Sequence, residues 1–375
     1  MPRRGAGEGS VFRRTDGRWC AYLSLGDGGR RYLYGKSRAD VQRKLAAAHR
    51  TQDDGLPFSP ERQTVGTFLT EWLEGQRQRL RPNTWKRYEE YVRLHAIPTL
   101  GRVKLAALSP QHLDRLYAQR VAAGLSPTTV HHIHAVLHKA LEQAVRWNLV
   151  PRNVAGLVDP PRAGRQEMTA LTPEQTRTLL EGATDGPLEA ILTLAVTTGM
   201  RKGELLALHW TDVDLERGTL RVVGTMQRLP DGKMAVTPPK TARSRRRVEL
   251  TPMALDALRR HRARQAEIRL LLGPEWNEAG LVFPSSLGKP QDGSHLLYGL
   301  FHPLLDRLGL PIIRFHDLRH TAATLLLGQG VHPKIVSEML GHSTIAITLD
   351  LYSHVTPTMQ RDAARAMNDL LLSRS

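Results

Sequence analysis

The stretch from Phe315 to Val355 constrains the fold most, because it places polar, chemically active side chains among apolar residues at helical spacing. Its candidates for chemistry are His316, Arg319, His342 and Tyr352. His316 and Arg319 are three residues apart, which predicts that they share one face of a helix. Glycines then interrupt the pattern, a proline opens a second helix and a Gly-His pair ends it. We expect a polar site held on packed helices, with the rest of the chain supporting it.

Charge is the most informative part of the composition. The 375 residues exceed one typical core, so two or three domains are expected. Lysine and arginine total 53 against 36 acidic residues, which gives a net charge of +17. Such an excess over several segments predicts a nucleic-acid partner. The alternative is a basic surface that serves only solubility.

The sequence contains one cysteine, Cys20. It predicts no internal disulfide and no cysteine-rich zinc site. The N-terminus lacks the apolar segment of a signal peptide, and no apolar run approaches the length of a membrane span. We therefore expect a cytoplasmic protein with no membrane partner.

Residues 1–57 show the alternation of β-strands followed by a helical pattern. The strand-like segments are Val11–Arg14, Trp19–Leu25 and Arg30–Tyr34, and the helix is expected over Arg38–Arg50. With twelve basic and six acidic residues, this module is expected to lay its sheet in the major groove of DNA. The alternative is a protein-interaction module. The candidate DNA-binding residues are Arg13, Arg14, Arg18, Arg30 and Arg31.

Residues 63–150 follow a polar linker and are predicted to form a compact helical bundle. Ser109-Pro110 and Ser126-Pro127 each have the pattern of an N-cap followed by a first helical proline, and Asn83 is expected to cap another helix. Basic residues cluster near the start of the helix that Asn83 is expected to cap. Backbone amides at a helix start also favour the binding of phosphate. The candidate DNA contacts here are Arg81, Lys86 and Arg87.

A histidine stripe lies on the last helix of this bundle, at His131, His134 and His138, and Glu142 continues it. A zinc site is one interpretation. However, a straight helix rises about 1.5 Å per residue, so ligands spread over three turns cannot all reach one ion. We expect a solvated or phosphate-facing stripe and no metal.

Residues 166–375 are expected to form a mixed α+β domain after a proline-rich boundary. Three segments, Thr219–Arg228, Met234–Thr237 and Arg246–Leu250, are predicted to form one small antiparallel sheet. A helix is expected over 253–272, a short strand at 281–283 and a further helix over 296–308. Residues 217–247 contain nine basic residues and one acid, which indicates a DNA-facing hairpin. Its candidate contacts are Arg243, Arg245 and Arg246.

Six residues suit one reaction, phosphoryl transfer at a DNA phosphodiester without a metal. They are Arg201, Lys240, His316, Arg319, His342 and Tyr352. Two guanidiniums can clamp the negative charge of the transition state. A tyrosine can attack phosphorus where a base or cations activate it, and a lysine can protonate the departing oxygen. No carboxylate pair with metal-binding spacing accompanies them, which argues against a two-metal nuclease.

These residues stand in five motifs that resemble those of the tyrosine recombinases, or phage integrases. The motifs are Thr-Gly-Met-Arg-Lys-Gly-Glu-Leu around Arg201, Pro-Lys-Thr-Ala-Arg-Ser around Lys240, His-Asp-Leu-Arg-His-Thr at 316–321, Leu-Gly-His-Ser at 340–343 and Leu-Tyr-Ser-His at 351–354. Each is weak alone, but all five in family order are specific. The resemblance implies a multidomain, mainly α fold with small β-sheets: an arm-type DNA-binding domain, a core-binding domain and a catalytic domain.

The resemblance also implies a role for each of the six residues. Tyr352 would be the nucleophile that forms a covalent 3′-phosphotyrosine, and Arg201 and Arg319 would hold the phosphate. Lys240 would be the general acid. His316 would assist proton transfer, and His342 would donate a hydrogen bond to the phosphate.

Neighbouring residues are expected to be structural. Glu204 is expected to orient the site, His320 to position its neighbours and Trp210 to lie in the core. His354 is expected to be structural or to lie at a protomer contact. The tail over 357–372 predicts an amphipathic helix that docks either on a neighbouring protomer or on its own domain.

The resemblance implies a bacterial or phage-encoded, nucleoid-associated integrase that inserts and excises a mobile element such as a prophage. Its partners would be core and arm attachment sites in duplex DNA, a homotetramer on synapsed DNA, and an excisionase and a DNA-bending protein. No cofactor is expected. Two alternatives remain: a related recombinase that resolves chromosomes or plasmids or relaxes DNA, and a non-catalytic DNA-binding regulator.

Overall fold

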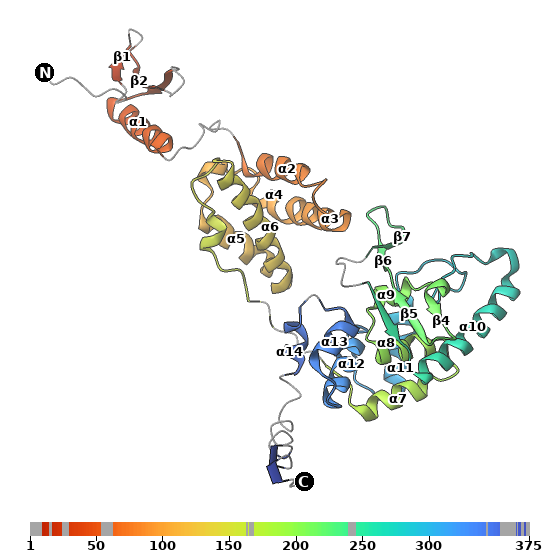
Figure 1. The fold of residues 1–375 in the computed structure, drawn as a ribbon. Helices are drawn as coiled ribbons and strands as arrows, with labels where there is room; N and C mark the ends of the chain where they lie inside the picture. The colour runs from red at the N-terminus through yellow and green to blue at the C-terminus, as the bar shows by residue number, and fades with distance from the viewer. Residues whose placement is uncertain are drawn as a thin grey trace. The chain divides into compact units, whose positions relative to one another are not determined.

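The computed structural model describes most of the chain. The described residues are 10–14, 17–24, 30–53, 63–162, 164, 169–238, 245–342 and 344–352, with 365, 367, 368, 371 and 372. The chain divides into two compact units, Met1–Arg165 and Gln166–Ser375 (Figure 1). Both are mainly helical with small sheets, as the sequence predicts. Among the described residues, no helix combines the length and the apolar character that crossing a membrane requires.

The first unit begins with the predicted three-stranded sheet and helix. The elements are β1 (Ser10–Arg13), β2 (Trp19–Ser24), β3 (Arg30–Gly35) and α1 (Arg38–Asp53). The strands are antiparallel in the order β1-β2-β3. One face packs on α1 through buried Ala21, Val41 and Leu45. Phe12 of β1 and Tyr34 of β3 both pair with Cys20 of the central strand, and both aromatic side chains remain exposed.

The rest of this unit is the predicted helical bundle. Its elements are α2 (Val65–Gly75), α3 (Pro82–Glu90), the π-helix η1 (Tyr91–Ala96), α4 (Ile97–Leu100), the 3-10 helix η2 (Leu105–Ala107), α5 (Pro110–Ala122), α6 (Pro127–Arg146) and the 3-10 helix η3 (Val154–Leu157). Ser109 and Ser126 are N-caps, as predicted. Asn83 is not, because α3 begins one residue earlier with Pro82 as its first helical residue. The core continues to Val158, beyond the predicted limit of 150.

The second unit contains more elements. They are α7 (Pro173–Ala183), α8 (Glu189–Thr198), α9 (Lys202–Leu206), η4 (Trp210–Asp212), β4 (Val213–Asp214), β5 (Thr219–Val222), β6 (Thr225–Arg228), β7 (Met234–Thr237), β8 (Arg246–Glu249), α10 (Pro252–Leu272), η6 (Gly273–Glu275), the π-helix η7 (His295–Phe301), α11 (His302–Arg307), α12 (Asp317–Gly328), α13 (Pro333–Leu340) and α14 (Ala346–Tyr352).

Its strands form two sheets, so the prediction of one sheet was wrong. β5 pairs with β4 and β8, whereas β6 pairs with β7. The chain changes partner at Gly224, which lies so close to the β7 strand that an added Cβ would meet Val236 Cγ1 at 2.6 Å. The prediction of a short strand at 281–283 is also wrong. Leu281 makes only an isolated bridge to His209.

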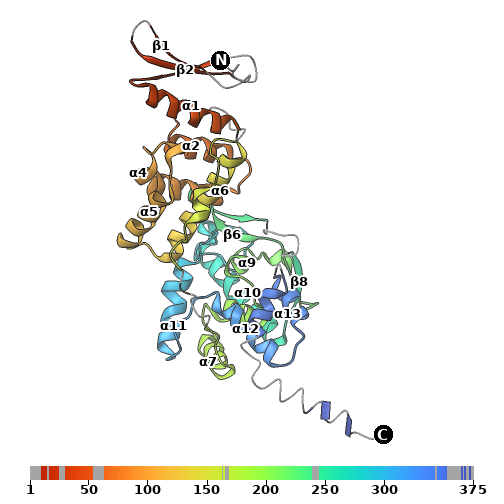
Figure 2. The same cartoon turned by 90° about the vertical axis from the view of Figure 1, so that its left-hand side faces the viewer.

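Helix α8 is the centre of this unit. Nine of its ten residues are buried, as expected for a helix that is apolar on all sides. Helices α7, α10 and α12 all contact it. α12 and α13 lie side by side and share a smaller core around Ala323 and Leu340 (Figure 2). This packing fixes the ends of α8, α12 and α13, where the predicted site residues lie.

Candidate active site

Arg201 is placed by the sharp turn between α8 and α9. Gly199 ends α8 with a φ of +61°, a left-handed conformation that favours glycine. An added Cβ there would lie 2.1 Å from Leu340 Cδ2, so α13 leaves no room for a side chain. Arg201 then forms the N-cap of α9. The Thr-Gly-Met-Arg motif therefore builds a turn that presents one guanidinium.

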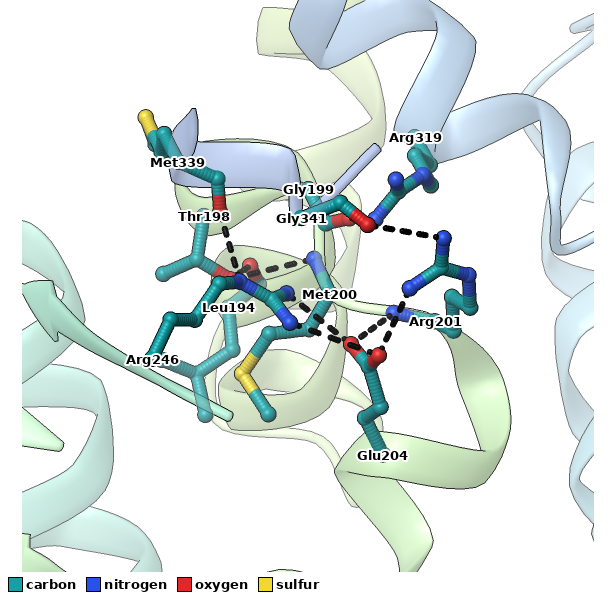
Figure 3. Close-up of polar contacts among 10 residues, drawn as sticks. All are labelled: Leu194, Thr198, Gly199, Met200, Arg201, Glu204, Arg246, Arg319, Met339 and Gly341. Carbon is teal, nitrogen blue, oxygen red and sulfur yellow. Dashed lines mark hydrogen bonds and ion pairs between the residues drawn. The ribbon is translucent and has the colours of Figure 1, made fainter. Parts of the chain in front are cut away.

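Glu204 holds Arg201 in that position (Figure 3). Its Oε1 lies 2.8 Å from Arg201 Nη1, and its Oε2 accepts a 3.0 Å hydrogen bond from the Arg201 backbone amide. The carboxylate is buried, with 4% of the side chain exposed. These contacts match the supporting role predicted for Glu204.

Arg319 lies on the first turn of α12, and its side chain is beside that of Arg201 (Figure 3). Its Nη1 donates a 2.9 Å hydrogen bond to the Gly199 carbonyl oxygen, and the residue is 3% exposed. Its Nη2 is buried without a hydrogen-bond partner among the described residues. His316 occupies the N-cap position of this helix with helical dihedral angles and without a side-chain capping hydrogen bond, and its carbonyl oxygen accepts a 3.1 Å hydrogen bond from the Arg319 backbone amide. Arg319 thus keeps an unused donor for a ligand.

His342 reaches the same place from the end of α13. Gly341 ends that helix with a φ of +67°, and its carbonyl oxygen accepts a 3.2 Å hydrogen bond from Arg201 Nη2. The Nδ1 atom of His342 lies 2.8 Å from the hydroxyl of buried Thr348. Thr348 was not predicted from the sequence, and it orients the ring so that Nε2 is the nitrogen left for a ligand.

The site is electropositive before any ligand binds. Burial, followed by the charge of Arg201, lowers the pKa of Arg319 well below its usual range. Burial, followed by the charges of Arg319 and Arg201, lowers the pKa of His342 to about 4. Partial burial and then the neighbouring His320, Arg319 and Arg201 lower that of His316 to about 4. An anion bound here would relieve this repulsion.

Glu204 is the counterion in this cluster. Its burial would raise its pKa, but the hydrogen bonds and charge of Arg246, together with Arg201, keep the pKa below its usual value. The carboxylate is therefore ionised at neutral pH. Figure 3 shows the guanidiniums of Arg201, Arg246 and Arg319 together with the carboxylate of Glu204, so positive charge is in excess among these residues.

The position of the Arg246 side chain corrects the prediction made for this residue. It was expected to contact DNA, but its side chain is 7% exposed and its Nη2 lies 2.9 Å from Glu204 Oε2. Strand alternation contained the signal, because Arg246 shares a face of β8 with buried Val248, whereas Arg247 and Glu249 are exposed. The basic composition of the segment concealed this signal.

Two of the six predicted residues cannot be placed fully. Lys240 lies outside the described residues. Tyr352 is the last residue of α14, but its side chain is not described. The structure therefore brings together Arg201, Arg319, His316 and His342.

The remaining predicted DNA contacts have three outcomes. Six have exposed side chains: Arg13, Arg14, Arg18, Arg81, Lys86 and Arg87. Arg245, next to β8, is also exposed. The side chains of Arg30 and Arg31 and the whole of Arg243 lie outside the description. Arg14 donates a 3.3 Å hydrogen bond to the Tyr34 hydroxyl, on the exposed face of the first sheet.

The histidine stripe of α6 is solvated in part: His131 is exposed, as expected, whereas His134 and His138 are half-buried. The Nδ1 atom of His134 lies 3.0 Å from the Tyr117 hydroxyl, and Glu142 Oε2 accepts a 3.2 Å hydrogen bond from Asn153. Among the described residues, no group of three or more His, Cys, Asp or Glu side chains is arranged to hold a metal ion.

Two of the residues expected to be structural do pack. Trp210 is half-buried rather than inside the core: it packs against the core of the second unit and donates a 2.5 Å hydrogen bond to Gln265. The His320 ring meets His316 edge-on, with the ring centroids 5.0 Å apart. His354 and most of the predicted tail helix lie outside the described residues.

Comparison with known proteins places this geometry in a family. A family model described as "Phage integrase family" matches residues 169–359, and "Phage integrase, N-terminal SAM-like domain" matches residues 64–119. A "Tyrosine recombinase XerC-like" protein of Caldanaerobacter subterraneus is 31% identical over 364 residues, which cover 92% of each chain. An "Integrase" of Streptomyces ambofaciens is 31% identical over 385 residues, which cover 96% of each.

Solved structures share the fold. The Tn1549 transposon integrase in complex with transposon right end DNA has a TM-score of 0.69 at 22% identity, covering 83% of this chain and all of that one. The lambda integrase tetramer bound to a Holliday junction has a TM-score of 0.57 at 17% identity, covering 93% of this chain and 96% of that one. At these identities the likeness concerns the fold alone.

Proposed function

The chain belongs to the phage integrase family and is a tyrosine recombinase, and on that premise we propose that it integrates and excises a mobile element through a covalent 3′-phosphotyrosine intermediate. The relatives named integrase belong to Streptomyces ambofaciens and to a mycobacteriophage, among others. Integration, rather than resolution of chromosomes, is also favoured by the basic sheet module at the N-terminus, which we assign to arm-type DNA sites.

One observation carries the proposal: Arg201 and Arg319, distant in sequence, meet around the carbonyl oxygens of Gly199 and Gly341. The buried donor of Arg319 has no partner among the described residues, and burial, followed by the charges of Arg319 and Arg201, lowers the pKa of His342. A phosphodiester supplies the missing anion and acceptor oxygens. The site therefore suits a phosphate that gains negative charge in its transition state.

The proposed reaction uses each of the six residues once. The Tyr352 hydroxyl loses its proton with the help of His316, and its oxygen forms a bond to phosphorus. The bond from phosphorus to the 5′-oxygen breaks, and Lys240 protonates that oxygen. Arg201, Arg319 and His342 hold the non-bridging oxygens. Because the phosphotyrosine keeps the ester bond, attack by a second 5′-hydroxyl rejoins DNA without ATP.

Assembly and partners belong to the same proposal. The enzyme would act as a homotetramer on two duplexes, with a tail helix over 357–372 docking on the neighbouring protomer. An excisionase and a DNA-bending protein would set the direction of the reaction. The protein would act in the bacterial cytoplasm, at the nucleoid. We assign DNA contacts to the exposed basic residues of the first unit and to Arg30, Arg31, Arg243 and Arg245.

A suicide DNA duplex, nicked beside the cleavage point of a core site, tests the mechanism. Wild-type protein should accumulate a covalent adduct that resists denaturing gels, and Tyr352→Phe should form none while still binding the duplex. An adduct on Tyr352→Phe would overturn the assignment of the nucleophile. Sequence-specific binding by a wild type that forms no adduct would instead favour the non-catalytic regulator.

A further inference from the structure

Arg246 is a buried cation that the proposed mechanism does not use. It is the first residue of β8, and its side chain points toward the site rather than toward solvent, with 7% of its surface exposed. A buried charge is costly unless it is paired and hydrogen-bonded. An arginine at this buried position therefore calls for a function that an apolar side chain would not supply.

The guanidinium of Arg246 joins three parts of the site (Figure 3). Its Nη2 lies 2.9 Å from Glu204 Oε2 and its Nη1 lies 3.4 Å from Glu204 Oε1, so it contacts both carboxylate oxygens. Its Nε donates a 2.7 Å hydrogen bond to the Met339 carbonyl oxygen in the last turn of α13. Gly341 packs directly on it, because an added Cβ would lie 3.1 Å from Arg246 Nη1.

Glu204 is consequently shared between two arginines. One is Arg201, which we assign to the phosphate, and the other is Arg246. If Arg246 were absent, the buried carboxylate would keep Arg201 as its one ion-pair partner among the described residues. Arg201 would then be held more tightly by Glu204, and its charge would be less available to a phosphate.

The hydrogen bond from Arg246 to the Met339 carbonyl oxygen acts on the geometry of the site. The Met339 carbonyl oxygen lies two residues before Gly341, whose own carbonyl oxygen contacts Arg201. His342 follows immediately. Arg246 therefore fixes the end of α13 at the point where that helix delivers His342 to the site.

We propose that Arg246 is a positioning residue for phosphoryl transfer: it compensates the charge of Glu204 and fixes the end of α13, so that Arg201 and His342 meet the phosphate together. This inference rests on the proposed function. It assigns Arg246 no contact with DNA, and it predicts an effect on the rate of cleavage rather than on affinity.

The test compares four variants of the full chain with wild type: Arg246→Met, Arg246→Lys, Glu204→Gln and the Arg246→Met/Glu204→Gln double variant. Arg259→Met is the matched control, because Arg259 is an exposed arginine on α10 paired with Asp256. The measurements are the rate of covalent adduct formation at saturating suicide duplex and the equilibrium affinity for that duplex. Unfolding midpoints show which variants are folded.

Arg246→Met should lower the rate about 100-fold, the size of effect seen when one preorganised electrostatic group is lost, with affinity little changed. Arg246→Lys should be intermediate, because one ammonium cannot reproduce the guanidinium's contacts. Adding Glu204→Gln to Arg246→Met should restore about 10-fold of the rate, because the uncompensated carboxylate is then neutral. Arg259→Met should match wild type.

Three results would overturn the inference. One is a wild-type rate for Arg246→Met. Another is a fall in affinity as large as the fall in rate, which would indicate a DNA contact. The third is a further loss, rather than recovery, in the folded double variant. Absence of an adduct from wild type would instead overturn the proposed function, so the two failures are distinguishable.

Discussion

The arginines around Glu204 and those of the N-terminal sheet are the same residue type in opposite settings. Arg246 and Arg319 are almost fully buried, and each donates to a backbone carbonyl oxygen of another element. Arg13 and Arg14 are exposed on a sheet whose buried core is small. Burial removes solvent screening, so a charge in the first setting acts strongly on its neighbours. In the second setting, screening reduces the same charge to a modest contribution.

This difference teaches how the two regions would use DNA. The buried set is fixed in geometry by caps, left-handed glycines and hydrogen bonds, which suits a transition state. The exposed set can follow a phosphate backbone and contributes additively. Substitutions should therefore have large, cooperative effects around Glu204 and small, separable effects on the sheet.

The largest expected effect is that of Arg319→Met. It removes the guanidinium whose Nη2 lies buried in the site. Covalent cleavage of the suicide duplex should fall about 1,000-fold, at the upper end for one lost transition-state donor. Arg319→Lys should recover little, because an ammonium lacks the planar fork. Near-normal cleavage by either folded variant would contradict the assignment of Arg319 to the phosphate.

Glu204→Ala should have the next largest effect, on stability. It leaves Arg246 buried without its carboxylate, which typically costs about 3–5 kcal/mol of the free energy of unfolding. Glu74→Ala is the matched control, because Glu74 pairs with Arg77 with both side chains 65% exposed. The control should cost less than about 1 kcal/mol. Urea unfolding measures both, and equal losses would remove the contrast between the two regions.

The pH dependence of stability should also depend on the buried site. The folded pKa of His342, about 4, lies below its ordinary value of 6.5. The unfolded chain therefore binds a proton first as pH falls, and the contribution of neutral His342 to stability is complete above 6.5. That contribution should be lost progressively between pH 6.5 and about 4. His342→Asn should show a smaller loss over this range in urea unfolding, and an unchanged loss would contradict the burial of the ring.

Arg14→Ala should give the smallest effect and sharpen the other side of the comparison. The slope of log affinity against log salt for an arm-site duplex should decrease by about 1, as expected for one lost phosphate contact. The free energy of unfolding should change by less than about 0.5 kcal/mol. Cleavage of core sites should stay at the wild-type rate. A large loss of stability would show that Arg14 is structural.

The sequence by itself determined the local structure and the chemistry of the parts. Serine and proline at helix starts, glycine at helix ends and alternation in residues 11–34 led to elements that the structure confirms. The motif residues could also be chosen from the sequence, because few reactions use two arginines, a lysine, two histidines and a tyrosine. These features depend on neighbours within a few residues.

Only the tertiary structure decided which strands pair and which charges are buried. The single sheet expected over 219–250 is two, because Gly224 approaches Val236 and the chain changes partner there. Arg246 was counted with the surface arginines, yet it lies against Glu204 and Met339. Those partners are 42 and 93 residues away. Whether an arginine faces solvent or a carboxylate depends on such distant contacts, and composition does not contain them.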